Sequence, residues 1–406
     1  MRFAAMERDR FFIGINYWPG NTGLYWWQMF ASAQVKRDFS ILTEYRLDVA
    51  RIFLMWEDFQ PEMGTVSVRA LHHLVQVADI AHDCGFRILP TFFCGHMLGI
   101  NWVPEWLVQP GKSKGGFPVG TDGKILSSPI RNMFTDREVR KAQKLLIHET
   151  TNALRGHPAV WGWDLGNQIT SFAVPPSREQ IRVWFEEMLN ELKRWDAHLP
   201  VTTTLHQRDL ESLWLLDSQE APRYCDFLSI EVLPPYPGWA DAPPDPAFPV
   251  FLSLMTKWIS NKDVILGSFG LPGQPPAGIL NEADLAKLDR FRLFSEGDAE
   301  THFHGVLSRL RQNGTLGALA WCFADLDSSL WDRPPFNERI HERFYGLFRV
   351  NGSPKGAAKI LSEFDRQPMP DAPDWAWIDM DRKEFFENPS SGLRHLYGRF
   401  KDWFGA

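Results

Sequence analysis

Short runs of apolar, β-branched and aromatic residues recur along the chain, separated by longer stretches of mixed polarity. Runs of this length favour buried strands, because a strand covered on both faces has no polar side. In the longer stretches, apolar residues stand three and four positions apart, which predicts helices with one buried face. The apolar runs predict eight strands, over 11–18, 49–54, 88–93, 160–165, 201–204, 227–230, 264–266 and 316–321.

Helices are predicted between these strands. Capping-box pairs, in which Ser or Thr precedes an acid or amide by three positions, predict that two helices begin at Thr135 (with Glu138) and Ser177 (with Gln180). Apolar spacing predicts further helices over 35–42, 71–81, 303–310 and 354–364.

This alternation predicts an α/β fold, because strands joined through helices pair in parallel by right-handed crossovers. Eight such units close into a (β/α)8 TIM barrel, and 406 residues accommodate one with insertions. A doubly wound open sheet is the alternative. That fold usually carries a glycine-rich phosphate turn after its first strand, and none follows Asn16.

The predicted connections are asymmetric. Turns from helix to strand are short, whereas loops from strand to helix are long, over 95–134, 233–246, 271–297 and 324–338. Because all long loops fall at the carboxyl ends of the strands, where barrel enzymes build their sites, we expect the site there.

No segment has linker composition, so we predict one barrel domain over 1–370. Residues 371–406 form a C-terminal extension rich in aromatic residues, which is expected to pack against the barrel as an added helix.

Charge and composition exclude several function classes. Lys and Arg number 43 against 50 Asp and Glu, a net charge of −7, which gives no basic footprint for nucleic acid or an anionic membrane. No apolar stretch approaches the roughly 18 residues of a spanning helix. The four cysteines lack metal-ligand spacing and predict free buried thiols, with no metal or cofactor. The first ten residues show no apolar signal region, which predicts a cytoplasmic protein.

Tryptophan is unusually frequent, at 18 residues. Trp fills cores or stacks on flat ligands, and position decides between the two. A group of these aromatic residues falls at or beyond the predicted carboxyl ends of strands, which favours a cleft that stacks on sugar rings: Trp102, Trp106, Trp239, Trp321 and Trp331.

Two stretches carry the most specific signal, residues 161–168 (WGWDLGNQ) and 264–270 (VILGSFG). With Arg51 and Trp321, they resemble the glycoside hydrolase clan A barrels, and family 5 in particular, with cellulase-like and endo-β-mannosidase-like members nearest. The stretches 14–18 (GINYW), 344–348 (FYGLF) and 351–355 (NGSPK) share this likeness, which covers about residues 10 to 365.

The chain departs from that family at both catalytic positions. The resemblance places a general acid/base Glu at Gln168 and a nucleophile Glu at Ser268. Gln cannot give up a proton at neutral pH, and Ser without an activating base is a weak nucleophile. The resemblance therefore implies a retaining β-glycosidase that works by double displacement, here catalytically inactivated.

Two explanations of these replacements stay open. One is deliberate inactivation of a working enzyme, which the intact neighbours Asn167, Gly267 and Phe269 favour. The other is a natural pseudo-enzyme that binds carbohydrate without hydrolysis.

The resemblance also implies a set of substrate-binding residues. It implies that Arg51 keeps the nucleophile ionised, that Asn167 bonds a sugar hydroxyl and that Trp321 forms an aromatic floor. Glu231 stands where the family often has His. Three roles are open for it: binding sugar hydroxyls, pairing with Arg51, or taking a catalytic role. In the last case, the barrel would carry a different chemistry centred on Glu231 and Asp58. The remaining candidates for sugar contact are Trp56, His96, His206 and Tyr236.

Overall fold

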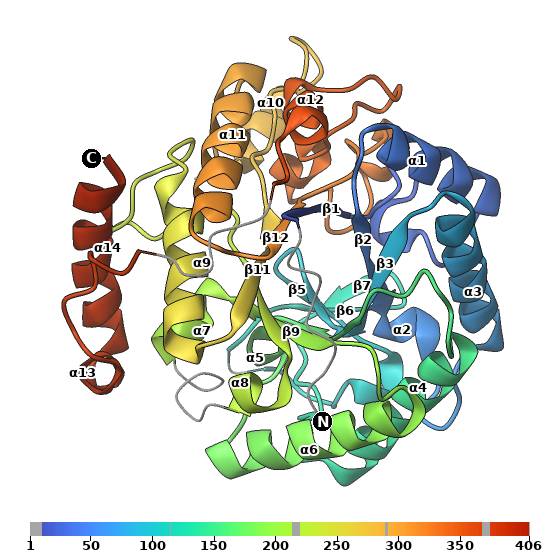
Figure 1. Cartoon of the computed structure of the whole chain (residues 1–406). Helices are drawn as coiled ribbons and strands as arrows, with labels where there is room; N and C mark the ends of the chain where they lie inside the picture. The colour runs from blue at the N-terminus through green and yellow to red at the C-terminus, as the bar shows by residue number, and fades with distance from the viewer. Residues whose placement is uncertain (1–9, 114, 213–219, 289–290, 368–373, 406) are drawn as a thin grey trace.

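The computed structural model describes residues 10–113, 115–212, 220–288, 291–367 and 374–405. Parallel strands close into an eight-stranded barrel in the order β1-β12-β11-β10-β9-β8-β3-β2 (Figure 1). The strands are β1 (Phe12–Asn16), β2 (Val49–Met55), β3 (Arg87–Cys94), β8 (Trp163–Asn167), β9 (Val201–His206), β10 (Phe227–Glu231), β11 (Asp263–Phe269) and β12 (Gly317–Ala320).

The predicted barrel is confirmed, and each predicted strand has its counterpart. The first and last strands close the barrel, because β1 pairs in parallel with β12, with Phe12 opposite Gly317. An open sheet would leave those two strands unpaired, so the alternative fold is excluded.

Helices surround the barrel (Figure 1). The longer ones are α1 (Ser32–Glu44), α3 (Val68–Asp83), α4 (Arg137–Ala153), α6 (Arg178–Trp195), α9 (Ala247–Ser260), α11 (Glu296–Gln312) and α12 (Gly356–Glu363). Short ones lie in the connections: α2 (Trp56–Phe59), α5 (Ile169–Phe172), α7 (Gln207–Ser212), α8 (Glu220–Tyr224), α10 (Glu282–Lys287) and the 3-10 segment η4 (Ile340–Phe344).

One of the two predicted helix starts is confirmed. The Ser177 hydroxyl accepts the Gln180 N–H at 3.3 Å and caps α6. The start at Thr135 is wrong by one residue, because the carboxylate of Asp136 accepts the N–H groups of Glu138 and Val139 and caps α4 instead.

The loop after β3 contains a structure that the sequence did not predict. Four short strands form a separate sheet, β4 (His96–Met97), β5 (Ile100–Trp102), β6 (Val119–Thr121) and β7 (Lys124–Leu126). This sheet stands at the carboxyl end of the barrel and fixes one side of the site described below.

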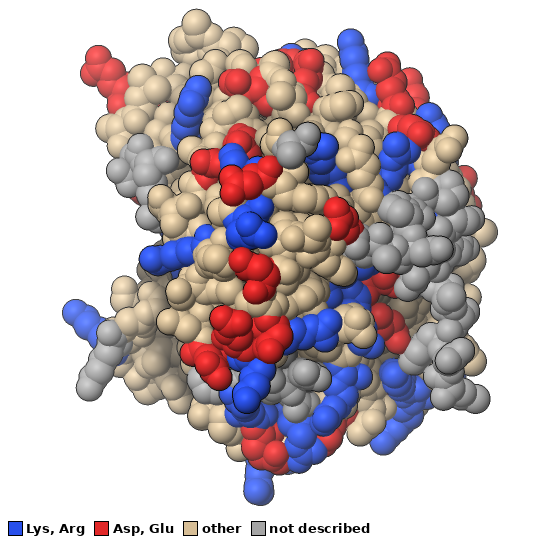
Figure 2. Space-filling view, turned by 60° about the vertical axis from the view of Figure 1, so that its left-hand side comes forward, with Lys and Arg blue, Asp and Glu red and all other residues tan. Residues whose placement is uncertain are grey.

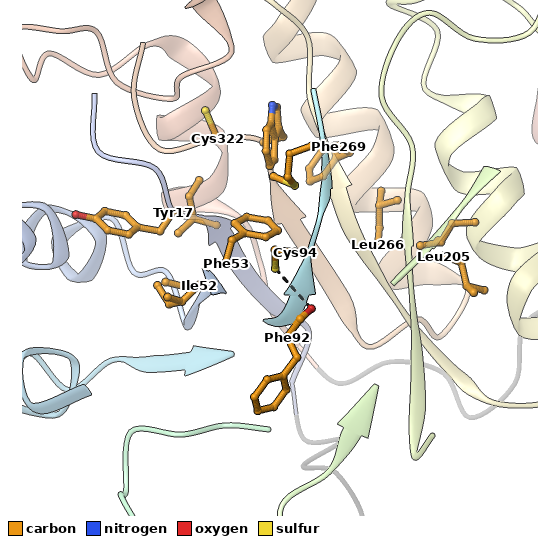
Figure 3. Packing of buried hydrophobic residues seen from close by; sticks show 14 of the residues in the cluster. Tyr17, Ile52, Phe53, Phe92, Cys94, Leu205, Leu266, Phe269 and Cys322 are labelled. Carbon is orange, nitrogen blue, oxygen red and sulfur yellow. Dashed lines mark hydrogen bonds between the residues drawn. The ribbon is translucent and has the colours of Figure 1, made fainter. Parts of the chain in front are cut away.

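Large apolar side chains fill the barrel. Near the amino ends of the strands, the Phe12, Trp161 and Phe227 rings pack in sequence, with centroids 5.1 and 5.8 Å apart, and close that end. Figure 3 shows part of the main cluster, which includes Phe53 and Phe269. The four cysteines are free, and all but Cys84 are buried.

The C-terminal extension forms two helices, α13 (Arg382–Glu387) and α14 (Pro389–Gly405), rather than one. They pack against α9, where Phe400 and Tyr397 lie 5.5 and 5.1 Å from the Phe251 ring (Figure 1). The predicted boundary at 370/371 falls outside the described residues. Basic and acidic side chains are interspersed over the face seen in Figure 2. Among the described helices, none is long and apolar enough to cross a membrane.

Candidate functional site

A cavity of about 680 Å³ opens at the carboxyl ends of the barrel strands. Its walls come from β4, the residues after β9 and β10, and the segment around η4. Most of the residues predicted to form a site line this cavity: His96, Asn167, Gln168, His206, Glu231, Tyr236 and Trp321. The structure therefore brings together residues that lie far apart in the sequence.

Arg51 lies beneath the cavity and is fully buried. Its Nη2 lies 2.6 Å from Asp164 Oδ2 and also donates to Asn167 Oδ1 at 3.0 Å, while Nε donates to Thr91 Oγ1 at 3.1 Å. Arg51 thus forms an ion pair across the barrel and holds Asn167. Since Ser268 has no carboxylate, Arg51 cannot have the role that the resemblance implied.

Asn167 is the last residue of β8, and both ends of its amide are held. Its Nδ2 donates to the His96 carbonyl at 3.2 Å, while its Oδ1 accepts from Arg51. A fixed amide presents a constant pattern of donor and acceptor atoms to a ligand in the cavity.

Gln168 follows in an uncommon backbone conformation, with φ at +49° at the start of α5. A non-glycine residue in this region is unusual and needs support from its surroundings. The Gln168 side chain is buried, and its Nε2 donates to Glu231 Oε1.

Glu231 ends β10 and stands opposite Ser268 of β11 in the strand register. Burial raises the pKa of Glu231 to about 7, although the Arg51 charge and the polar groups of Ser268 and Gln168 act in the opposite direction. A Gln amide can donate to a carboxylate or accept from a carboxylic acid, so the contact persists in both states of Glu231.

Ser268 is fully buried and does not line the cavity. Its hydroxyl forms no well-aligned hydrogen bond with a described residue, although it is close enough to Glu231 to favour the ionised carboxylate. A buried hydroxyl of this kind has no access to a ligand in the cavity as the structure stands.

Trp56 is a correction to the predicted set. Its indole is fully buried, donates to Gln60 Oε1 at 2.9 Å and packs against Phe93 and Trp106. Because no part of it reaches the cavity, it supports the wall and does not contact a ligand there.

Only two of the tryptophans assigned to the cleft line the cavity, Trp239 and Trp321. Trp102 is buried, and Trp106 and Trp331 donate their indole N–H groups to backbone carbonyls of Gln60 and Leu326. The expectation of a cleft rich in tryptophan therefore holds in part. Other rings complete the walls: Phe117, Tyr236, Phe248 and Phe291.

His96 and His206 line the same wall, and both are neutral at pH 7. Burial, with a smaller contribution from the positive charges of Arg208 and Arg339, lowers the pKa of His96 to about 4, although the hydrogen bond with Asn101 acts in the opposite direction. Burial and Arg208 lower the pKa of His206 to about 3. Neutral imidazoles can donate to or accept from a ligand hydroxyl.

Sequence reasoning missed four charged residues that line the cavity, Arg339 and Glu342 beside or within η4 and Arg208 and Glu211 on α7. Glu342 accepts the Trp321 indole N–H at 3.4 Å. The available signal was the run at 338–342 (ERIHE), in which charges alternate with apolar or aromatic residues in a loop at the site end.

No protein-family model matches the sequence, and no curated protein matches it. Solved structures do match. A GH5_18 protein (glycoside hydrolase family 5, subfamily 18) from Streptomyces cattleya in complex with GlcNAc superposes with a TM-score of 0.70 at 18% identity, covering 97% of this chain and 90% of that chain.

Two further structures agree. A Glu→Ala variant of GH5_18 from Bifidobacterium longum subsp. longum, in complex with Manβ1-4GlcNAc, gives a TM-score of 0.68 at 19% identity and covers 87% of this chain and 77% of that chain. An exo-β-1,4-mannosidase from Opitutaceae bacterium strain TAV5 gives a TM-score of 0.69 at 20% sequence identity, and the match covers 89% of this chain and 61% of that chain. The chain thus has a family 5-like (β/α)8 barrel, the fold of these glycoside hydrolases.

Proposed function

We propose that this chain binds a short saccharide in the cavity and does not hydrolyse it by double displacement. One observation carries the proposal. Gln168, which the resemblance equates with the acid/base, lines a cavity of saccharide size, and Ser268, which it equates with the nucleophile, lies buried opposite Glu231 of the cavity wall; neither has a carboxyl group.

The chemistry follows from the missing carboxyl groups. Retaining hydrolysis needs two of them, roughly 5–5.5 Å apart across the scissile bond. Glu231 is engaged with Gln168, and the other carboxyl groups that line the cavity, Glu211 and Glu342, stand on α7 and η4 and not at positions 168 or 268. Binding needs only the cavity, its aromatic walls and fixed polar groups such as Asn167, all of which are present.

Buried polar atoms near the nucleophile position support descent from an enzyme of this kind. Arg51 Nη1 and Ser268 Oγ are buried and form no hydrogen bond with described residues. A Glu in place of Ser268 would bring acceptor oxygens toward Arg51 Nη1, whereas with Ser at this position Nη1 has no partner among the described residues.

The three departures from the family pattern form one group in space. Gln168 bonds Glu231, and Glu231 stands opposite Ser268. A Glu at position 168 would place a second carboxylate against Glu231, so the Gln168 amide is matched to its neighbour. This matching favours a natural binding protein. Deliberate inactivation remains the second candidate, and Glu codons at 168 and 268 in the natural gene would decide for it.

The first ligands to test come from the neighbours. GH5_18 structures hold Manβ1-4GlcNAc and GlcNAc. Isothermal titration of the intact chain with both sugars and a wider panel of β-linked disaccharides should show binding, with no release of reducing sugar after prolonged incubation.

Variants at two tryptophans locate the binding. Trp239→Ala, which removes a cavity ring, should weaken binding at least tenfold. Trp195→Ala is the matched control, because Trp195 ends α6 outside the cavity and stacks on His148. Absence of binding across the panel would overturn the proposal, as would turnover that Glu231→Gln abolishes, which would instead assign catalysis to Glu231.

A further inference from the structure

The wall of the cavity that faces His96 carries two positive charges. Arg208 comes from α7, after β9, and Arg339 comes from the residue before η4, after β12. Both line the cavity, and the charges of both act on His96 and lower its pKa. Two distant segments therefore bring guanidinium groups to the same part of the cavity.

Neither guanidinium is neutralised. Within the described ranges, the side chain of Arg208 or Arg339 makes no hydrogen bond and has no carboxylate within 4.0 Å. Arg343, four residues after Arg339, shows the usual arrangement, with its Nη1 3.1 Å from Asp284 Oδ1. Arginines in this loop can therefore pair with an acidic residue, and the lack of such a pair is specific to the arginines that line the cavity.

Packing holds both side chains in place without supplying a charge. The Arg339 guanidinium lies over Gly99, where a Cβ would be 2.8 Å from Nη2; Gly99, at φ +76°, leaves the room that it needs. The Arg208 guanidinium lies 5.8 Å from the Phe117 ring centre, and that ring lies 4.1 Å from His96.

The acidic residues that line the cavity form no ion pair with either arginine among the described residues. Glu231 bonds Gln168, and Glu342 lies 3.5 Å from His341 Nε2 while accepting the Trp321 indole N–H. Glu211 is exposed on α7, and the described residues show no ion pair between it and Arg208. The wall therefore carries two guanidinium groups that border the cavity without an ion-paired carboxylate among the described residues.

We propose that the saccharide bound here is acidic, and that Arg208 and Arg339 hold its oxyanion. A guanidinium group matches the oxygens of carboxylate, sulfate and phosphate with paired N–H donors, and two of them suit a group with two or three oxygens. The neutral imidazoles of His96 and His206 beside them suit the adjoining sugar hydroxyls. This inference rests on the proposed function and specifies the ligand class of the same cavity.

The test compares matched sugars by isothermal titration at 50 mM NaCl. The pairs are glucuronic acid and glucose, GlcNAc 6-sulfate and GlcNAc, and mannose 6-phosphate and mannose, each as the monosaccharide and the β-linked disaccharide. We expect the acidic member of at least one pair to bind tenfold or more tightly than the neutral one. The advantage should shrink at 500 mM NaCl, because salt screens exposed charges.

Variants assign the effect to the two arginines. Arg208→Gln and Arg339→Gln should each remove most of the acidic advantage, so that the acidic and neutral members of a pair bind within about twofold of each other. Arg333→Gln is the control: it lies in the same loop region but outside the cavity, over the Tyr25 ring. Circular dichroism verifies that each variant folds.

The outcomes separate the two proposals. Binding of neutral sugars with no acidic preference overturns this inference and leaves the proposed function standing. No binding of any sugar overturns both. If inorganic phosphate or sulfate alone binds as tightly as the sugar anion, the wall is a simple anion site and the inference also fails.

Discussion

Arginines stand in two contrasting settings around one cavity. Arg51, beneath it, is fully buried and bonded to Asp164, Thr91 and Asn167. The side chains of Arg208 and Arg339, in the wall, form no hydrogen bond or ion pair with a described residue. The comparison teaches that a buried charge must be compensated by the protein itself, whereas a charge that borders a solvent-filled cavity can be left for a ligand.

The largest expected effect tests the buried side of this comparison. Arg51→Ala leaves the Asp164 carboxylate buried without its cation, and breaking such a pair costs on the order of 3–5 kcal/mol. We expect a fall of that size in the free energy of unfolding, measured by urea titration.

The double variant Arg51→Met with Asp164→Leu supplies the control for charge. It removes both ions and should recover part of the loss. A single variant as stable as the parent would show that the pair contributes nothing to the barrel.

Glu231 gives the next largest effect, through pH. Its pKa is about 7 in the folded state, raised from 4.5 by burial, so the folded state binds this proton more tightly than the unfolded state. The contribution of this proton to the free energy of unfolding is complete below pH 4.5. It is lost as the pH rises toward 7, at about 1.4 kcal/mol per pH unit.

The comparison with Glu231→Gln isolates this contribution from other titrating groups. From pH 4.5 to 7.5, the parent should lose about 3 kcal/mol of stability relative to the variant, measured by denaturant titration across that range. A stability difference that is constant over the range would contradict a raised pKa.

Restoring catalysis is expected to need three changes. Gln168→Glu and Ser268→Glu supply the two carboxyls, but the new Glu at 168 would face Glu231. Adding Glu231→His, the residue often found in the resembled family, removes that repulsion. We expect the triple variant to hydrolyse aryl β-glycosides at least about 100-fold faster than the parent, the lower range for a positioned acid/base.

The matched double variant, which keeps Glu231, should hydrolyse more slowly than the triple variant. Equal rates would show that Glu231 does not oppose catalysis. An inactive triple variant with an intact fold by circular dichroism would count against assigning positions 168 and 268 from the family resemblance.

The sequence predicted the barrel well because strands buried on both faces leave continuous apolar runs, as at 264–266 in β11 and at 316–321 around β12, and these runs can be recognised without knowing the loop geometry. It placed Gln168 and Ser268 correctly at strand ends for the same reason. It could not separate Trp56 from Trp321, since burial of an indole at a strand end depends on what the next loop covers. Arg339 was missed because only the folded path of the loop after β12 brings it to His96.

The smallest expected effect tests the open side of the comparison. Arg339→Gln removes a charge that no described residue compensates, so it breaks no ion pair and should change the free energy of unfolding by no more than about 0.5 kcal/mol, as at other surface sites. Removing positive charge near Arg208 should, if anything, stabilise the fold slightly, because the two guanidinium groups repel each other. A loss of 2 kcal/mol or more, on the scale of a broken buried network, would mean that Arg339 supports the loop as Arg51 supports the barrel. The contrast between a charge held for structure and a charge held for a ligand would then fail.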